Sequence, residues 1–192
     1  MTATASFPDA TIPSATPSSW LKRYYGTRAL FSALWAALAF TIGRAQPAFG
    51  IALLVAYPLW DCLANAVDAA RNGGLRTNPS QALNVLVSAL VTLAIVVAVT
   101  VGHDLHAAIA VIGLWAGLSG LLQLATGIRR WRSARGQWPQ ILSGAQSVLA
   151  AAHIIMTATS PSVVVGAADV GLYAAFGAFY FAVSAAMLQL KR

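Results

Sequence analysis

Six apolar runs, each about as long as a helix that crosses a bilayer, divide this chain. A helix needs about 20 residues to span the roughly 30 Å of hydrocarbon in a membrane. The runs are apolar on nearly all sides, whereas a surface helix of a soluble protein has one apolar stripe. Only 9% of the residues are charged, against about 25% in soluble domains. The sequence therefore predicts an all-α membrane protein with six transmembrane helices, near residues 27–43, 48–70, 80–101, 105–128, 138–159 and 163–189.

Turn-forming segments group these runs into three tandem hairpins, at about residues 27–70, 80–128 and 138–189. An aromatic residue stands at a similar place in the second helix of each hairpin: Trp60, Trp115 and Tyr173. We take these three as equivalent positions of an internal repeat, which is a common way to build membrane bundles. Residues 20–192 are thus expected to form one six-helix domain.

Basic residues predict the orientation. The turn after the fourth run carries Arg129, Arg130, Arg132 and Arg135 with no acid. With alternating passes, all 12 Lys and Arg residues except Arg44 fall on one side, which is then cytoplasmic. We expect a multi-pass membrane protein with both termini in the cytoplasm, and anionic lipid headgroups bound to the Arg129–Arg135 turn. The net charge of +7 is divided among separate loops, so no nucleic-acid partner is predicted.

The first 19 residues are rich in Ala, Thr, Ser and Pro and contain little large apolar surface. Such a composition predicts a disordered cytoplasmic tail. Its charged residues follow it rather than precede an apolar core, which is unlike a signal peptide. The single cysteine, Cys62, excludes an intrachain disulfide.

The central part of the chain resembles a known family. The segment 114–123, LWAGLSGLLQ, is followed by the basic turn and by 138–144, WPQILSG. This pattern resembles the short-repeat membrane domain of the HdeD family of bacterial acid-resistance proteins. The resemblance implies an inner-membrane protein of the acid or envelope stress response, and it supplies no catalytic residues. We therefore expect no enzyme activity, cofactor or metal. The first hairpin departs from the pattern by carrying Asp61, Asn65 and Asp68.

The second helix is predicted to have a polar face. Asp61, Asn65 and Asp68 are spaced by four and three residues, which places them on one side of a helix. Gln123 of the fourth helix is a further polar candidate within the membrane. Counted from Arg71, Asp61 lies about 15 Å deep, near the bilayer centre. An acid at that depth is expected to face protein or water.

Two interpretations of this face stay open. Asp61 is either a proton carrier or cation ligand of a small-solute or proton transporter, or a structural residue. In the structural case it is protonated or bonded to a neighbour, with the candidates Asn84, Ser88, Thr92 and Gln123. Pro58, one turn earlier, frees backbone carbonyls for a polar partner. Asp68 is expected to pair with Arg71 near the cytoplasmic rim.

Two further sets of residues are candidates for packing and for pH response. Small residues at helical spacing predict close helix contacts, within the chain or with a second copy: Gly113, Gly117, Gly120, Ala174 and Ala178. Titratable residues on the predicted outer side would gain positive charge in acid: His103, Asp104, His106, His153 and Asp169. The alternative is that these are ordinary polar residues of turns and helix ends.

One catalytic motif competes with the packing interpretation. Residues 117–120, Gly-Leu-Ser-Gly, resemble the motif of the rhomboid intramembrane serine proteases, and His153 on the next helix offers a base for Ser119. The second helix lacks the His-x-x-x-Asn that such proteases use to stabilise the oxyanion. The sequence favours a packing motif, with an intramembrane protease as the minor alternative.

Overall fold

The computed structural model describes residues 19–130 and 138–190, and every regular element in this part is helical. In chain order these elements are α1 (Ser19–Phe40), α2 (Ile42–Ala45), α3 (Pro47–Arg71), α4 (Pro79–Thr100), α5 (Leu105–Arg130), α6 (Trp138–Ala158), the 3-10 helix η1 (Ala167–Val170) and α7 (Gly171–Leu190). Six helical segments are long and apolar enough to cross a membrane, with α1 and α2 forming one of them. The predicted all-α class with six such helices is confirmed.

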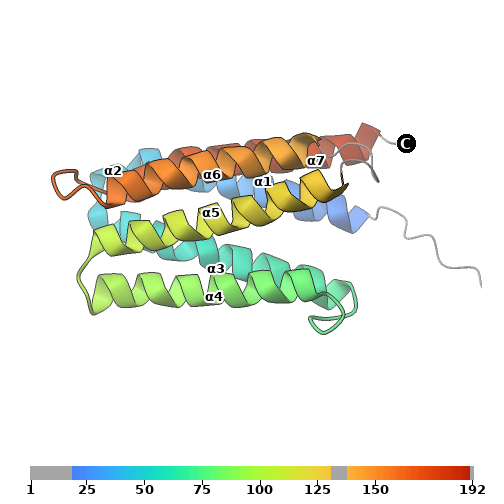
Figure 1. Cartoon of the computed structure of the whole chain (residues 1–192), viewed down its shortest axis with the longest axis horizontal. Helices are drawn as coiled ribbons and strands as arrows, with labels where there is room; N and C mark the ends of the chain where they lie inside the picture. The colour runs from blue at the N-terminus through green and yellow to red at the C-terminus, as the bar shows by residue number, and fades with distance from the viewer. Residues whose placement is uncertain (1–18, 131–137, 191–192) are drawn as a thin grey trace, which may run out of the picture.

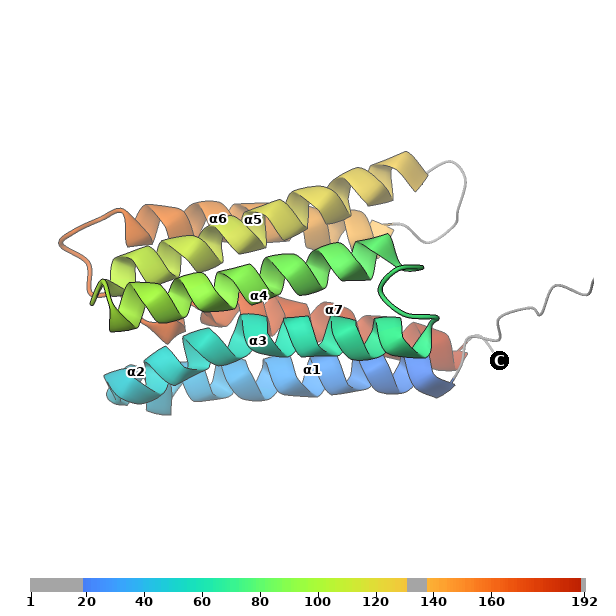
Figure 2. The same ribbon diagram turned by 90° about the horizontal axis from the view of Figure 1, so that it is seen from below.

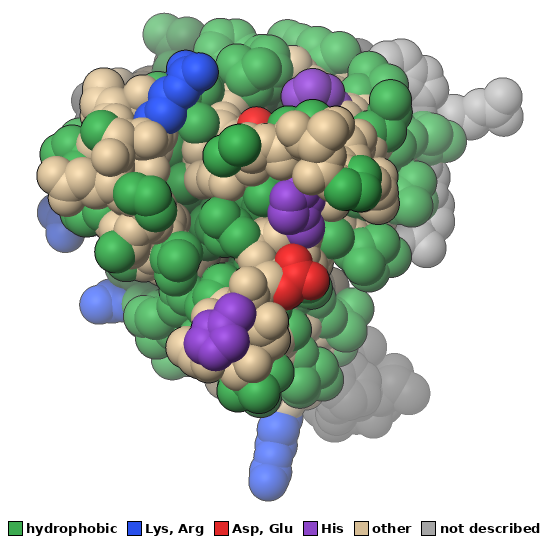
Figure 3. Space-filling view, turned by 90° about the vertical axis from the view of Figure 1, so that its left-hand side faces the viewer, with side chains coloured by type: hydrophobic (Ala, Val, Ile, Leu, Met, Phe, Trp, Pro, Cys, Tyr) green, Lys and Arg blue, Asp and Glu red, His purple; other side chains and the backbone are tan. Residues whose placement is uncertain are grey.

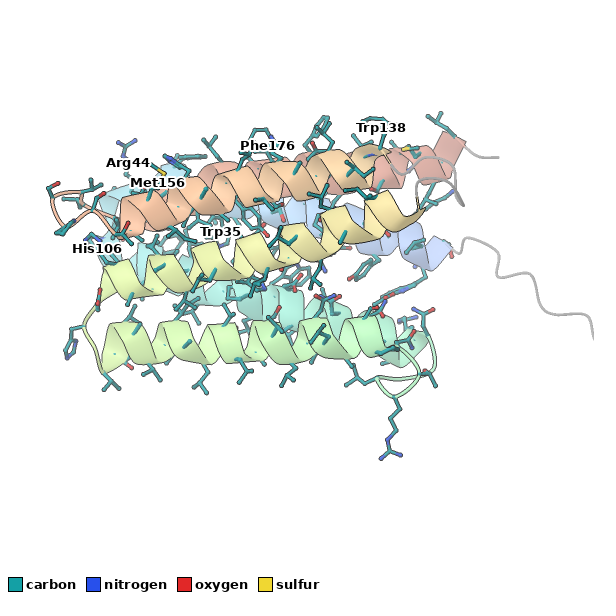
Figure 4. All side chains as sticks on the ribbon, viewed as in Figure 1. Trp35, Arg44, His106, Trp138, Met156 and Phe176 are labelled. Carbon is teal, nitrogen blue, oxygen red and sulfur yellow. The ribbon has the colours of Figure 1, made fainter. Side chains whose placement is uncertain are left out.

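The six segments form an elongated bundle of alternating direction (Figure 1). The start of α1 and the end of α7 lie at one end, here called the terminal end, together with the α3–α4 turn. The opposite end, here called the far end, carries α2 and the turns before α5 and after α6. Figure 4 shows Trp138 toward the terminal end and Arg44 and His106 at the far end. Residues 1–18, 131–137 and 191–192 lie outside the described part, and with them the predicted tail and most of the arginine-rich turn.

Two helix starts differ from the sequence prediction. The first helix begins at Ser19 rather than at residue 27, because Trp20 and Tyr24 find hydrogen-bond partners within the bundle and the helix continues through them. The last begins at Ala167, as a 3-10 turn, rather than at residue 163. The β-branched run 163–165 disfavours a helix start, and Asp169 accepts a hydrogen bond from the Gly166 N–H at 2.7 Å, which fixes the start there.

Helix pairing follows a ring. The most extensive contacts join α1 to α7, α3 to α4, and α5 to α6. In each case the second helix of one repeat packs on the first helix of the next, and α7 closes the ring on α1. Figure 2 shows α4 beside α3, and α6 behind α5, from below. The bundle is therefore a pseudo-threefold arrangement of the three predicted repeats, with the closest packing between repeats rather than within them.

The packing also fixes the register of the repeat. Tyr57, Trp115 and Tyr173 recur at an interval of 58 residues and meet edge to face, with ring centroids 5.9 to 6.2 Å apart. Tyr57, not Trp60, is therefore the equivalent of Trp115 and Tyr173. The next two sets at this interval, Leu54 with Ile112 and Val170, and Pro58 with Ala116 and Ala174, form fully buried layers.

Small residues bring α5 and α6 together. A side-chain carbon on Gly120 would lie 2.9 Å from the Gly144 carbonyl oxygen, and one on Gly144 would lie 2.6 Å from the Leu124 nitrogen. Gly113 and Gly117 face α6 in the same way. Ala174 is buried in the ring centre and Ala178 is half-buried on α7. The small residues of α5 thus pack within the chain, as close helix approach in a membrane requires.

Candidate functional site

An ion pair inside the bundle is the centre of the candidate site. Arg28 of α1 binds Asp61 of α3 through its Nη2, and each of the two side chains is 14% exposed. It is the only ion pair formed by the described residues. In the sequence, Arg28 contributes only to the predicted orientation, and its pairing with Asp61 is not predicted. The signal was present, because Arg28 lies inside the first apolar run and an intramembrane charge needs a counter-charge.

Neutral donors occupy the rest of the Asp61 carboxylate. The Ser88 hydroxyl of α4 donates to Oδ2 at 2.8 Å, and the Asn65 amide donates to the same oxygen at 3.1 Å. Asp61 therefore joins α1, α3 and α4. Of the four neighbours expected from the sequence, Ser88 is the one that binds it.

The other three expected neighbours do not bind Asp61. Asn84 is exposed on α4, and the Thr92 hydroxyl donates to the Ser88 carbonyl at 2.7 Å. Gln123 is half-buried on α5. Asn84, Ser88 and Thr92 are spaced by four residues and share one side of α4, so their positions along the helix decide which of them reaches the acid, and the sequence does not resolve this.

Arg28 is incompletely bonded. Its Nη1 donates to the Tyr24 hydroxyl at 2.9 Å, and its guanidinium carbon lies 4.5 Å from the centre of the Phe181 ring. Its Nε is buried and has no hydrogen-bond partner, and the same holds for the indole nitrogen of Trp60, the residue next to Asp61. Two buried N–H groups, one on Arg28 itself and one on Trp60, which precedes Asp61 in the chain, thus lack an acceptor, which native structures rarely leave without water or a ligand.

Asp68 forms a second polar cluster nearer the terminal end. Its carboxylate accepts hydrogen bonds from the Trp20 indole at 3.1 Å, the Asn72 amide at 3.0 Å and the Gln81 amide at 3.2 Å. Arg71 does not pair with it; its guanidinium instead lies 4.2 Å from the centre of the Trp20 ring. The expected Asp68–Arg71 pair is therefore wrong. The longer first helix supplies Trp20, which takes the place between them.

An aromatic layer separates this polar network from the far end. Tyr57 stacks on Trp35 with ring centroids 4.8 Å apart, and it also contacts Trp115 and Tyr173. The Trp35 indole donates to the Leu53 carbonyl at 2.7 Å. The next carbonyl, that of Leu54, is the one that Pro58 leaves without its helical hydrogen bond. Beyond the aromatic layer lies the fully buried layer of Leu54, Ile112 and Val170. The centre of the bundle is thus closed toward the far end.

The predicted pH-responsive residues lie toward the far end (Figure 3). His103 and His153 are exposed, whereas His106 is half-buried and its Nδ1 lies 2.9 Å from the Ala158 carbonyl oxygen. Asp104 accepts a hydrogen bond from the Ala107 N–H at 2.9 Å and so caps α5; Asp169 caps η1. No hydrogen bond joins these five described side chains to one another. Asp104, His106 and Asp169 thus have local contacts at turns or helix ends, and His153 is an exposed residue of α6.

The protease alternative has no geometric support. Gly117 faces Ala151 across the α5–α6 contact, whereas His153 is exposed, and no hydrogen bond joins Ser119 to His153. Across residues 19–130 and 138–190, no three His, Cys, Asp or Glu side chains are arranged to hold a metal ion. What the site offers chemically is one guanidinium, two carboxylates and a set of neutral donors.

Comparison with known proteins returned no match to any protein family, curated protein or solved structure.

Proposed function

We propose that this chain is a non-enzymatic, multi-pass protein of the bacterial inner membrane that acts in the response to acid or envelope stress. The bonding of Asp61 is the observation that supports a protein without enzyme or transport activity. Its carboxylate is held by Arg28, Ser88 and Asn65 at once, so it joins three helices. An acid bonded in this way has a structural role among these helices, because removing any one partner leaves a polar group buried.

The stress role rests on the resemblance of segments 114–123 and 138–144 to the HdeD family. The pattern of small residues in that resemblance coincides with the closest helix contact, where Gly120 and Gly144 meet. Both termini are proposed to be cytoplasmic. Supporting this orientation, Lys22, Arg23, Arg71 and Arg76 belong to the segments of the terminal end, and Arg44 lies at the far end.

Lipid is the proposed partner of the terminal end. The Arg129–Arg135 turn would bind anionic headgroups, helped by Trp138, which is exposed at the start of α6. A homo-oligomer remains part of the proposal, with exposed apolar helix faces available to lipid or to a second copy.

A deletion strain tests the stress role. Its survival in acid should fall relative to the parent strain, and expression of the wild-type chain should restore it. Equal survival of the two strains under acid and envelope stress would contradict the proposal.

Vesicles that contain the purified protein test for transport. They should show no proton flux. A flux that disappears in Asp61→Asn would instead favour a transporter.

Cysteine labelling tests the orientation. A probe placed at His103, with Cys62 replaced by Ser, should be modified by a membrane-impermeant reagent added from the periplasm. A probe at Thr77, in the α3–α4 turn, should be protected until the membrane is broken. The reverse pattern would overturn the proposed topology.

A further inference from the structure

Arg28 has more donors than partners. A guanidinium carries five N–H donors, and two bonds leave it, to Tyr24 and to Asp61. The contact with Asp61 uses one carboxylate oxygen, Oδ1, whereas paired Arg and carboxylate groups frequently form two parallel bonds. The buried Nε is left free. Nε and Nη2, of which Asp61 occupies Nη2, form the edge of the guanidinium whose donor geometry recognises a carboxylate or another small anion.

The surroundings of Arg28 suit a small ligand. The ring of Phe181 lies 4.5 Å from the guanidinium carbon, and that of Tyr24 lies 5.5 Å away, so aromatic faces flank the charge. The indole nitrogen of Trp60 adds a second buried donor without an acceptor. Both members of the ion pair keep 14% of their side chains exposed.

Burial differs between the two sides of this ion pair along the bundle. Toward the far end, the layers of Leu54 with Ile112 and Val170, and of Pro58 with Ala116 and Ala174, are fully buried. Toward the terminal end, the repeat-equivalent positions of Asn65 are Gln123 and Phe181, and both are half-buried. The layer on the side that faces the chain termini, in which Asn65 is 8% exposed, is therefore less completely buried than the two layers on the other side.

Charge balance limits what can bind. Arg28 and Asp61 neutralise each other, so an anion added beside them would leave one uncompensated negative charge in the bundle. The charged and titratable groups around Asp61 are Arg28 and Tyr24 from α1, Tyr57, Cys62 and Asp68 from α3, and Tyr173 from α7; α4 contributes only the neutral Ser88. None of these supplies a second positive charge.

We propose that Arg28 is a binding site for a small monovalent anion, such as a short carboxylate or a halide, which enters together with one proton. The proton, from water, bonds to a carboxylate oxygen of Asp61, and the contact between Asp61 and Arg28 opens. The anion then accepts hydrogen bonds from Nε and from the Nη2 that Asp61 has left. One positive and one negative charge enter together, so the net charge of the site is unchanged.

This inference goes beyond the proposed stress function and does not depend on it. Binding of an anion with a proton requires no passage across the membrane, because the far end is closed by two buried layers. Acid survival tests the proposed function, whereas a binding isotherm tests this site, and the two outcomes are independent.

The experiment measures acetate and chloride binding to the purified chain in detergent, in weak buffer with a pH indicator. Each bound anion should remove about one proton from solution. Its affinity should rise about tenfold for each unit that the pH falls while Asp61 is ionised in the free protein. Arg71→Gln, which removes a cation stacked on Trp20, should leave binding unchanged.

Two variants separate the parts of the site. The double variant Arg28→Gln/Asp61→Asn removes both charges, keeps the side-chain size and should bind no anion. Asp61→Asn alone should bind the anion without proton uptake and without pH dependence. Absence of binding to the wild type, binding without proton uptake, or equal binding to the double variant would each overturn the proposal. If neither variant folds, the number of protons that the wild-type chain takes up per bound anion still tests the proposal.

Discussion

The first repeat and the other two share a framework but differ in chemistry. Leu54, Ile112 and Val170 occupy one fully buried layer of α3, α5 and α7, and the three differ little in character. Two turns further toward the terminal end, α3 carries Asp61 where α5 has Ser119 and α7 has Gly177. The acid of the first repeat binds an arginine, whereas the equivalent positions carry no charge.

This difference indicates which part of the sequence holds the fold. Apolar layers common to all three repeats close the ring, whereas the ion pair is present in only one of them. A feature that occurs once in a threefold framework is not needed by the framework itself. Removing the whole pair should therefore be tolerated, and removing half of it should not.

The largest effect is expected from breaking the pair on one side. Arg28→Gln leaves Asp61 buried without its cation and should lower the free energy of unfolding by about 3–5 kcal/mol. The double variant Arg28→Gln/Asp61→Asn should recover most of that loss. Denaturant unfolding of both variants in detergent makes the comparison. Equal midpoints for the single and double variants would show that the cost is not one of unpaired charge.

The next effect tests the shared framework. Ile112→Ala opens a cavity in a layer that is 0% exposed and should cost about 2–5 kcal/mol. Leu54→Ala, at the equivalent position of the first repeat, should fall in the same range. Leu114→Ala is the matched control, since that side chain is 58% exposed, and should change stability by about 0.5 kcal/mol or less. A cost at Leu54 far above that at Ile112 would argue against equivalent repeats.

Much of the fold follows from the sequence for a simple reason. Length and hydropathy decide whether a segment can cross a membrane, and both are local properties, so six helices were predicted within a few residues at most ends. The start of α1 is not predicted, because Trp20 and Tyr24 are residue types typical of the interfacial segment that precedes a transmembrane helix. Tyr24 accepts a hydrogen bond from Arg28, one turn further along the same helix, whereas Trp20 donates to Asp68, which is distant in the chain and reached only once α1 and α3 are packed.

The site was predictable in part. The spacing of Asp61, Asn65 and Asp68 predicted a single polar face, and the face is present on α3, with Asn65 and Asp68 buried. The partners were not predictable, because they depend on helix rotation and neighbour order. The ring places α1 and α4 on either side of α3, which brings Arg28 and Ser88 to one carboxylate. The repeat register was offset by three residues for the same reason: only packing distinguishes Tyr57 from Trp60.

A smaller effect is expected at the second acid. Asp68→Asn keeps the size of the side chain but replaces one acceptor oxygen by a donor, which faces the N–H donors of Trp20, Asn72 and Gln81. The variant should lose about 1–2 kcal/mol. Hydrogen exchange should also speed up in the first two turns of α1, which Trp20 ties to α3. Unchanged exchange there would mean that packing alone holds the start of α1.

The smallest effect is expected from Ser119→Ala, and it is the sharpest test of the contrast between repeats. Ser119 is the second repeat's equivalent of Asp61, is half-buried, and forms no hydrogen bond with another described side chain. Its removal should change stability by about 0.5 kcal/mol or less. Ser88→Ala is the matched comparison, since that hydroxyl is fully buried and donates to Asp61 at 2.8 Å; losing a bond to a charged acceptor should cost about 1.5–3 kcal/mol. Thermal unfolding of both variants in the same detergent measures the difference. If Ser119→Ala costs as much as Ser88→Ala, the second repeat has a polar contact of its own. If it instead abolishes acid survival while stability is unchanged, Ser119 has a chemical role, and the protease alternative would have to be tested again with His153→Gln.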